Sequence, residues 1–171
     1  MCDLKYYLYN LYEAQNMDNT SEEELIQIDK QWEQNNLTYQ EIFQRLENRL
    51  PSNIFQHFNG WGFHDSRLVK VEFEHTSFLK LNINFIISND AAKKKDEKFW
   101  ILSFKNVSQF QFQHLNARNE ACVFHREIDD WLYQEFLPVD EYSLSFEVLF
   151  SSGANISLQF PNNDVTLDQK S

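Results

Sequence analysis

Trp61-Gly62-Phe63-His64-Asp65-Ser66 marks the point where the pattern of apolar residues changes along this chain. Before this stretch apolar residues recur with helical spacing, and after it they alternate with polar residues, as in a half-buried strand. The same stretch holds the only cluster of side chains suited to chemistry. It separates an expected helical portion, residues 1–60, from an expected antiparallel β portion, residues 61–160, and a polar, frayed tail follows over residues 161–171.

The helical portion is predicted to contain three helices and a short helical turn. Apolar spacing predicts the first helix from about Asp3 to Gln15. Ser21 and Thr38 each begin a capping-box pattern, so a second helix starts at Ser21 and a third at Thr38. We expect Asn35-Asn36 to separate these two helices. Residues on the buried helix faces are predicted to be Leu4, Tyr7, Leu8, Leu11, Tyr12, Leu25, Ile28, Trp32, Ile42, Phe43, Leu46, Leu50, Ile54, Phe55 and Phe58.

The β portion is predicted from alternation with a period of two residues. His75-Thr76-Ser77 is expected to turn the first hairpin, and Ser151-Ser152-Gly153 the last one. A bulge near Lys105-Asn106 would restore the register of the middle strand. The positions predicted to be buried are Val71, Phe73, Leu81, Ile83, Phe146, Val148 and Leu158.

The chain has 171 residues, the size of one ordinary domain. It carries 16 Phe, 7 Tyr and 4 Trp but only 3 Gly and 3 Pro, and aromatic residues favour strands and bury large areas. No helical pattern separates the strand patterns, so parallel βαβ units are not expected. The sequence predicts one α+β domain, residues 1–171, with N-terminal helices packed on a six- to seven-stranded antiparallel sheet that curls into a sandwich or half-barrel.

The formal net charge is -11, from 15 Lys and Arg against 26 Asp and Glu. A negative field repels phosphate backbones and anionic lipid. Nucleic acids and membranes are therefore not expected as partners, whereas a basic protein is. Plain solubility is the simpler interpretation of the same charge.

The first residues lack the basic segment and apolar run of a secretion signal, and no stretch of about 18 apolar residues occurs. We therefore expect a cytoplasmic protein. Cys2 and Cys122 lack the Cys-x-x-Cys spacing of metal or redox sites, so we expect reduced thiols.

His64 and Asp65 are the sharpest candidate pair. A carboxylate can orient an imidazole and tune its pKa, which suits a general base or a metal ligand. Neighbouring residues on an extended chain point to opposite sides, however, and Asp-Ser before a strand is typical of a turn. We favour the structural interpretation, in which Asp65 accepts backbone amides and His64 packs among Trp61 and Phe63.

A later strand carries Trp131, Tyr133 and Glu135, which are expected to share one face. Burial would raise the pKa of Glu135, but a glutamate near a strand end is more often exposed, and we favour exposure. The histidines lack zinc-site spacing and no glycine-rich phosphate loop is present, so neither a metal nor a cofactor is expected. The candidate binding residues are Trp61, His64, Asp65, Trp131, Tyr133 and Glu135.

Four motifs together resemble a known group of proteins: Trp61-Gly62-Phe63-His64-Asp65, Phe104-Lys105-Asn106-Val107, Trp131-Leu132-Tyr133-Gln134-Glu135 and Leu149-Phe150-Ser151-Ser152-Gly153. The chain resembles, over roughly Leu50 to Phe160, a family of small uncharacterised bacterial proteins with a helical start and an antiparallel β domain. Some of these are similar to the immunity proteins of polymorphic toxin systems. The resemblance implies a non-enzymatic binding protein and supplies no catalytic residues. The loop with Lys93-Lys94-Lys95 departs from the compact connection expected of the group.

Three functions from different classes follow. The leading one is a non-enzymatic cytoplasmic protein-binding module, of the immunity type, that neutralises a basic effector. The alternative is a small hydrolase or metal-dependent enzyme centred on His64 and Asp65, which needs a cleft where His64 meets a distant acid such as Glu135. The third is a structural subunit whose edge strands pair in a homodimer.

Overall fold

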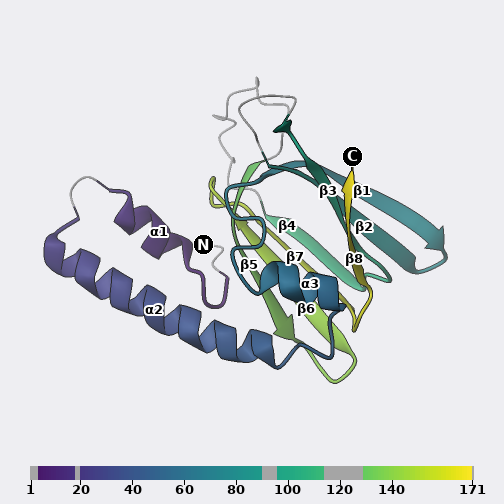
Figure 1. The fold of residues 1–171 in the computed structure, drawn as a ribbon, viewed down its shortest axis with the longest axis horizontal. Helices are drawn as coiled ribbons and strands as arrows, with labels where there is room; N and C mark the ends of the chain where they lie inside the picture. The colour runs from purple at the N-terminus through teal and green to yellow at the C-terminus, as the bar shows by residue number, and fades with distance from the viewer. Residues whose placement is uncertain (1–3, 18–19, 90–95, 114–128, 171) are drawn as a thin grey trace.

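The computed structural model describes residues 4–17, 20–89, 96–113 and 129–170 (Figure 1). Among these residues three helices come first and eight strands follow. The helices are α1 (Tyr9–Gln15), α2 (Glu22–Gln44) and α3 (Ser52–Phe58), and the strands are β1 (Arg67–Ser77), β2 (Lys80–Ser88), β3 (Phe99–Phe104), β4 (Gln109–Gln113), β5 (Asp129–Pro138), β6 (Ser143–Phe150), β7 (Asn155–Pro161) and β8 (Val165–Lys170). The predicted α+β class is confirmed, with eight strands in place of six or seven.

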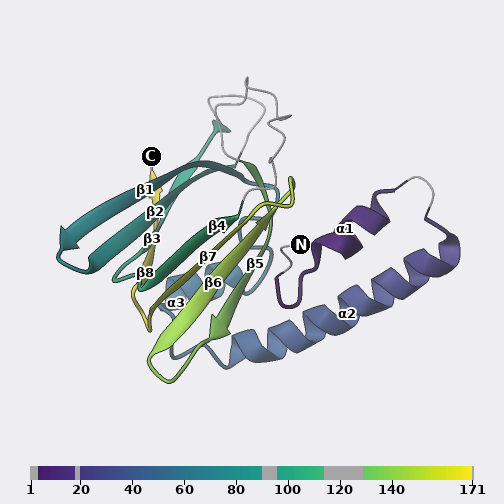
Figure 2. The ribbon, with the colours of Figure 1, turned by 180° about the vertical axis from the view of Figure 1, so that it is seen from behind.

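The strands of the described residues form one antiparallel sheet in the order β4-β7-β6-β5-β1-β2-β3-β8, which is not closed. Its two halves meet where Arg67 and Leu68 of β1 pair with Asp130 and Asp129 of β5. Beyond this point β1 diverges from β5, and the sheet curls so that the two halves enclose the core (Figures 1 and 2).

Phenylalanine rings from both halves of the sheet meet in the core. Phe104 of β3 lies 4.8 Å from Phe146 of β6 and 4.9 Å from Phe160 of β7, centroid to centroid. The helices belong to the same core, since Phe55 of α3 stacks on Phe43 of α2 at 5.0 Å. The N-terminal part of α2 extends away from the sheet, with α1 beside it (Figure 2).

Helix α2 is longer than the sequence predicts. Ser21 caps it as expected, because its hydroxyl accepts the Glu24 amide and the Glu24 carboxylate accepts the Ser21 amide. The predicted break at Asn35-Asn36 and the predicted new helix at Thr38 are wrong, since α2 runs through all three residues. The Thr38 hydroxyl donates to the Gln34 carbonyl of the same helix instead of capping a new one.

The two asparagines hold a segment that is distant in sequence. The Asn35 side chain donates to the Tyr6 carbonyl at 2.8 Å, and the Tyr7 hydroxyl donates to Asn36 at 2.9 Å. Asparagine usually favours turns because its side chain competes for nearby backbone groups. Here the N-terminal segment occupies both side chains, so the helix continues.

The first helix is shorter than predicted, since residues 4–8 are not helical. Their backbone N–H groups are partnered differently: those of Lys5, Tyr6 and Tyr7 donate to the carboxylate of Glu135. N–H groups in a first helical turn have no intrahelical acceptor, so the buried carboxylate satisfies donors that a helix would leave unpaired.

The β1–β2 hairpin is present, but it turns at Phe78-Leu79 rather than at His75-Thr76-Ser77. Its far end projects beyond the core (Figure 1). Of the predicted buried positions, Phe73 is therefore wrong, being 53% exposed. Val71 and Leu81 are half-buried, and the other four, Ile83, Phe146, Val148 and Leu158, are buried as predicted.

Two further sequence predictions are wrong. No bulge occurs at Lys105-Asn106; the chain crosses there from β3 to β4, which pairs with β7, and Asn106 adopts a left-handed conformation (φ 53°). The expected frayed tail instead forms β8, which pairs with β3 and buries Val165 completely. The Ser151-Ser152-Gly153 hairpin is confirmed.

Some of the residues singled out in the sequence lie outside the described residues: Cys2, Cys122, Lys93-Lys94-Lys95 and the polar stretch from His114. No helix of the described residues is long and apolar enough to span a bilayer.

Candidate functional site

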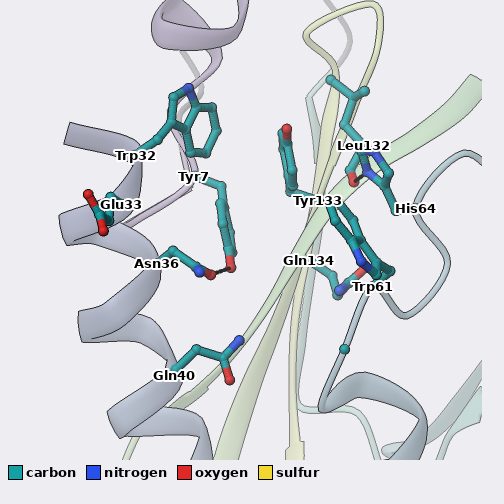
Figure 3. Close-up of a pocket in the computed structure, with 11 residues that line it drawn as sticks. Tyr7, Trp32, Glu33, Asn36, Gln40, Trp61, His64, Leu132, Tyr133 and Gln134 are labelled. Atoms are coloured by element: carbon teal, nitrogen blue, oxygen red, sulfur yellow. Dashed lines mark hydrogen bonds between the residues drawn. The ribbon is translucent and has the colours of Figure 1, made fainter. Parts of the chain in front are cut away.

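An open cleft of about 440 Å³ lies between the middle of α2, the first half of β5 and the turn before β1 (Figure 3). The side of α2 contributes Trp32, Glu33, Asn36 and Gln40, and Tyr7 of the N-terminal segment lies beside them. The opposite side contributes Gly60, Trp61, His64, Leu132, Tyr133 and Gln134. The lining thus combines aromatic rings, side-chain amides and one carboxylate, and it contains no lysine or arginine.

The turn before β1 is built by glycine and by hydrogen bonds to β5. Gly62 has φ +57°, and a Cβ there would lie 2.8 Å from Phe58 Cδ1 and 2.9 Å from Gln134 Nε2. The amide of Asp65 donates to the Trp131 carbonyl, and the amide of Trp131 donates back to the Ser66 carbonyl. The turn is therefore fixed to the start of β5.

His64 lies in a column of rings that runs from the turn before β1 to Tyr7 of the N-terminal segment. Its ring is 5.0 Å from Trp61 and 5.2 Å from Tyr133, and Tyr133 stacks in turn on Tyr7 at 4.9 Å. His64 Nδ1 donates to the Leu132 carbonyl, which leaves Nε2 as the second nitrogen of the ring. The histidine packs among aromatic side chains as expected, with Tyr133 rather than Phe63 as its second neighbour.

Asp65 does not behave as predicted. Its side chain is 86% exposed, and its carboxylate oxygen lies 3.5 Å from His64 Nε2. Among the described residues no backbone amide donates to this carboxylate, so the predicted turn bonds are wrong. The left-handed conformation of Asp65 (φ 62°) turns the side chain outward beside the histidine.

A bulge in β5 separates Trp131 from Tyr133. Trp131 pairs with Phe150 and Tyr133 with the adjacent Leu149, so Leu132 is an extra residue. The prediction that Trp131 shares a face with Tyr133 and Glu135 is wrong, because an extra residue reverses the alternation. Trp131 is fully buried in the core, and its indole N–H donates to Gln134 at 2.7 Å.

Glu135 is also completely buried, so the prediction that it is exposed is wrong. Its pKa is raised to about 7, mainly by burial and also by the negative charge of Glu147, its cross-strand partner on β6. The three backbone N–H groups of residues 5–7 oppose this shift because they stabilise the charged form. Glu135 therefore holds the N-terminal segment that brings Tyr7 to the cleft.

The structure brings together three of the six predicted site residues, since Trp61, His64 and Tyr133 line the cleft and Asp65 lies at its edge beside His64. Trp131 belongs to the core and Glu135 lies under the N-terminal segment. Sequence reasoning assigned Tyr7 and Trp32 to helix packing faces and did not single out the other lining residues. Neither a capping pattern nor the spacing of apolar residues shows which helix face lies opposite a strand. The aromatic side chains of Tyr7 and Trp32 were therefore the only sequence feature that could have indicated a place in the cleft.

The described residues contain no group of three or more His, Cys, Asp or Glu side chains placed to hold a metal ion. The lining offers ring faces, amide oxygens and the Glu33 carboxylate. Such groups accept hydrogen bonds and attract positive charge.

No protein-family model matches the chain, and neither does a curated protein or a solved structure. The geometry and charge of the cleft are therefore the basis on which a function is proposed.

Proposed function

We propose that this chain is a non-enzymatic, cytoplasmic protein-binding module that takes a basic protein as its partner, in the manner of an immunity protein that neutralises a basic effector. The observation that carries the proposal is the open, aromatic cleft, with Trp61 74% exposed at its edge. Tryptophan and tyrosine are enriched among the residues that dominate binding energy at interfaces. A large indole is costly to leave in water unless a partner covers it.

Charge supports a basic partner. The net charge of -11 favours the approach of a positive protein. Glu33 on the α2 side and the exposed Asp65 beside His64 on the opposite side place negative charge at the edges of the cleft. Complementary charge of this kind raises association rates and disfavours acidic partners.

The test uses a basic effector candidate encoded beside the gene for this chain, with affinity measured by titration calorimetry. We expect binding that weakens as salt is raised, and a loss of about tenfold or more for Trp61→Ala, the level of an interface residue worth more than about 1.4 kcal/mol. Tyr142→Ala is the matched control, because Tyr142 is also 74% exposed but lies in the β5–β6 turn. Equal loss in both variants, or none in Trp61→Ala, would contradict the proposal.

A second candidate, an enzyme centred on His64 and Asp65, is favoured by one observation: His64 Nε2 lies 3.5 Å from the Asp65 carboxylate at the edge of the cleft. Its expected acid, Glu135, is engaged by three backbone N–H groups instead. Under the binding proposal, His64→Ala lowers the free energy of unfolding by about 1 to 2 kcal/mol and leaves a folded protein. An unchanged melting temperature together with loss of a hydrolytic activity would favour the enzyme.

A further inference from the structure

We infer that the cleft between α2 and β5 receives a cationic side chain, lysine or arginine, of the partner. The inference rests on the proposed function and names the group that the cleft recognises.

The cleft is lined by one carboxylate, that of Glu33. The lining contains no lysine or arginine. In the described residues no hydrogen bond or ion pair involves the Glu33 carboxylate, whereas other exposed acids such as Glu72 pair with a lysine of their own. The α2 rim of the cleft therefore carries a carboxylate that has no ion-pair partner of its own among the described residues, on the side of the helix away from Trp61 and His64 (Figure 3).

Trp61 provides an aromatic surface at the edge of the cleft. The indole of Trp61 lies against His64 with the two rings tilted by 42°, and most of its surface remains exposed at the edge of the cleft (Figure 3). A lysine or arginine can pack its methylene stem on such a ring while its charged end reaches a carboxylate. A cation close to a tryptophan face gains further attraction from the ring.

Three side-chain amides also line the cleft. Asn36 and Gln40 of α2 project toward the cleft in Figure 3, and Gln134 lies opposite them. An ammonium or guanidinium group has several donors and no acceptor, so it requires surrounding oxygens. Among the described residues the Gln40 side-chain oxygen accepts no hydrogen bond, and those of Asn36 and Gln134, which accept the Tyr7 hydroxyl and the Trp131 indole N–H, each keep a second lone pair. A phosphate or carboxylate ligand would find no cation in the lining to balance its charge.

The test measures binding of single-residue probes by NMR titration of the tryptophan indole N–H signals, at about 150 mM salt, where the screening length is about 8 Å. The probes are N-acetyl-lysine methylamide and N-acetyl-arginine methylamide. Their neutral counterparts, the norleucine and citrulline derivatives, have similar shapes without the charge. We expect at least one cation to shift the Trp61 signal in a saturable way and to bind about tenfold more tightly than its neutral counterpart.

Glu33→Gln removes the charge and keeps the shape, and we expect it to abolish most of this preference. Glu41→Gln is the matched control, because Glu41 is exposed on the same helix, about 12 Å along its axis, and does not line the cleft. Equal binding of norleucine and lysine derivatives, no saturable shift at Trp61, or equal effects of the two glutamine variants would each overturn the inference.

The two proposals fail separately. Suppose that the basic protein binds, that Trp61→Ala weakens this binding, and that the cationic probes bind no more tightly than the neutral ones. The proposed binding function is then supported, and the inference that the cleft receives a cationic side chain is wrong. If the probes bind as expected but no basic protein does, the cleft is a site for free organic cations and the proposed function is wrong.

Discussion

Glu135 is the residue whose environment departs most from its expected one. A glutamate in the second half of a strand reads as exposed, yet here the N-terminal segment covers it and donates three backbone hydrogen bonds to it. Those donors come from residues 128 to 130 positions away in sequence. Local pattern carries no information about such a contact.

The raised pKa of Glu135 predicts how stability varies with pH. The folded-state pKa of about 7 exceeds the usual value of 4.5, so between these values the folded state binds more protons than the unfolded state. The stabilisation is fullest below about pH 4.5 and is lost as the pH rises through about 7, by an amount on the order of 3 kcal/mol. Urea unfolding across this range is expected to show a steeper fall for the native chain than for Glu135→Gln.

Glu147 provides the control for this prediction. Its carboxylate raises the pKa of Glu135, so Glu147→Gln is expected to lower that pKa. The pH-dependent loss of stability should then be smaller and be complete at lower pH than in the native chain. Parallel pH profiles for the native chain and Glu135→Gln would show that Glu135 does not titrate in this way.

At Gly62 both the backbone conformation and the surrounding packing disfavour a side chain. Its positive φ and the short distances from an added Cβ to Phe58 and Gln134 predict that Gly62→Ala lowers the free energy of unfolding by about 2 to 3 kcal/mol. Gly60→Ala is the control, since nothing lies within 4 Å of a Cβ at that position. Its effect in the same urea titration should stay within about 0.5 kcal/mol; similar losses in the two variants would contradict the argument.

At the scale of elements, α2 shows why two similar capping patterns gave one cap. Ser21 starts the helix, whereas Thr38 lies inside it because the preceding turn is held by contacts with the N-terminal segment. The patterns are alike in sequence. The difference arises because Asn35 and Asn36 find partners outside the helix.

Alanine substitutions distinguish the two positions. Ser21→Ala is expected to lower the free energy of unfolding by about 1 kcal/mol through loss of the cap. Thr38→Ala is expected to be neutral or slightly stabilising, since alanine is the better residue inside a helix. Chemical denaturation followed by far-UV circular dichroism measures both, and a loss of about 1 kcal/mol at Thr38 would show that a helix begins there after all.

At the scale of the whole molecule, the helices and the sheet share one core. Tyr39, Phe43 and Leu46 are buried with the strands, and the amide of Phe136 in β5 donates to the Tyr39 hydroxyl. Removing Met1 to Pro51 would therefore uncover aromatic side chains of the sheet. We expect the remaining chain to be insoluble or to lose its near-UV circular dichroism and its cooperative unfolding.

A shorter deletion, Met1 to Leu8, serves as the control. It removes the segment that covers Glu135 and leaves the helical part of the core in place. We expect this variant to remain folded with a lower melting temperature. A well-folded, soluble fragment starting after Pro51 would show instead that the sheet is stable alone.

The sequence by itself determined the class of the fold and the type of most elements. Alternation predicted the hairpins around β1, β2, β6 and β7, and the capping box of Ser21 predicted the start of α2, because these signals depend on neighbours a few residues apart. It also marked Trp61, His64 and Tyr133, whose ring chemistry is visible in the residue type alone.

Only the tertiary structure decided which faces meet. The bulge at Leu132 reversed the side of Trp131, the pairing with β3 turned an expected frayed tail into β8, and the N-terminal segment buried Glu135 and brought Tyr7 to Trp32. Each of these outcomes depends on a partner far away along the chain, and the free energy of such contacts exceeds the weak local preferences that a sequence displays.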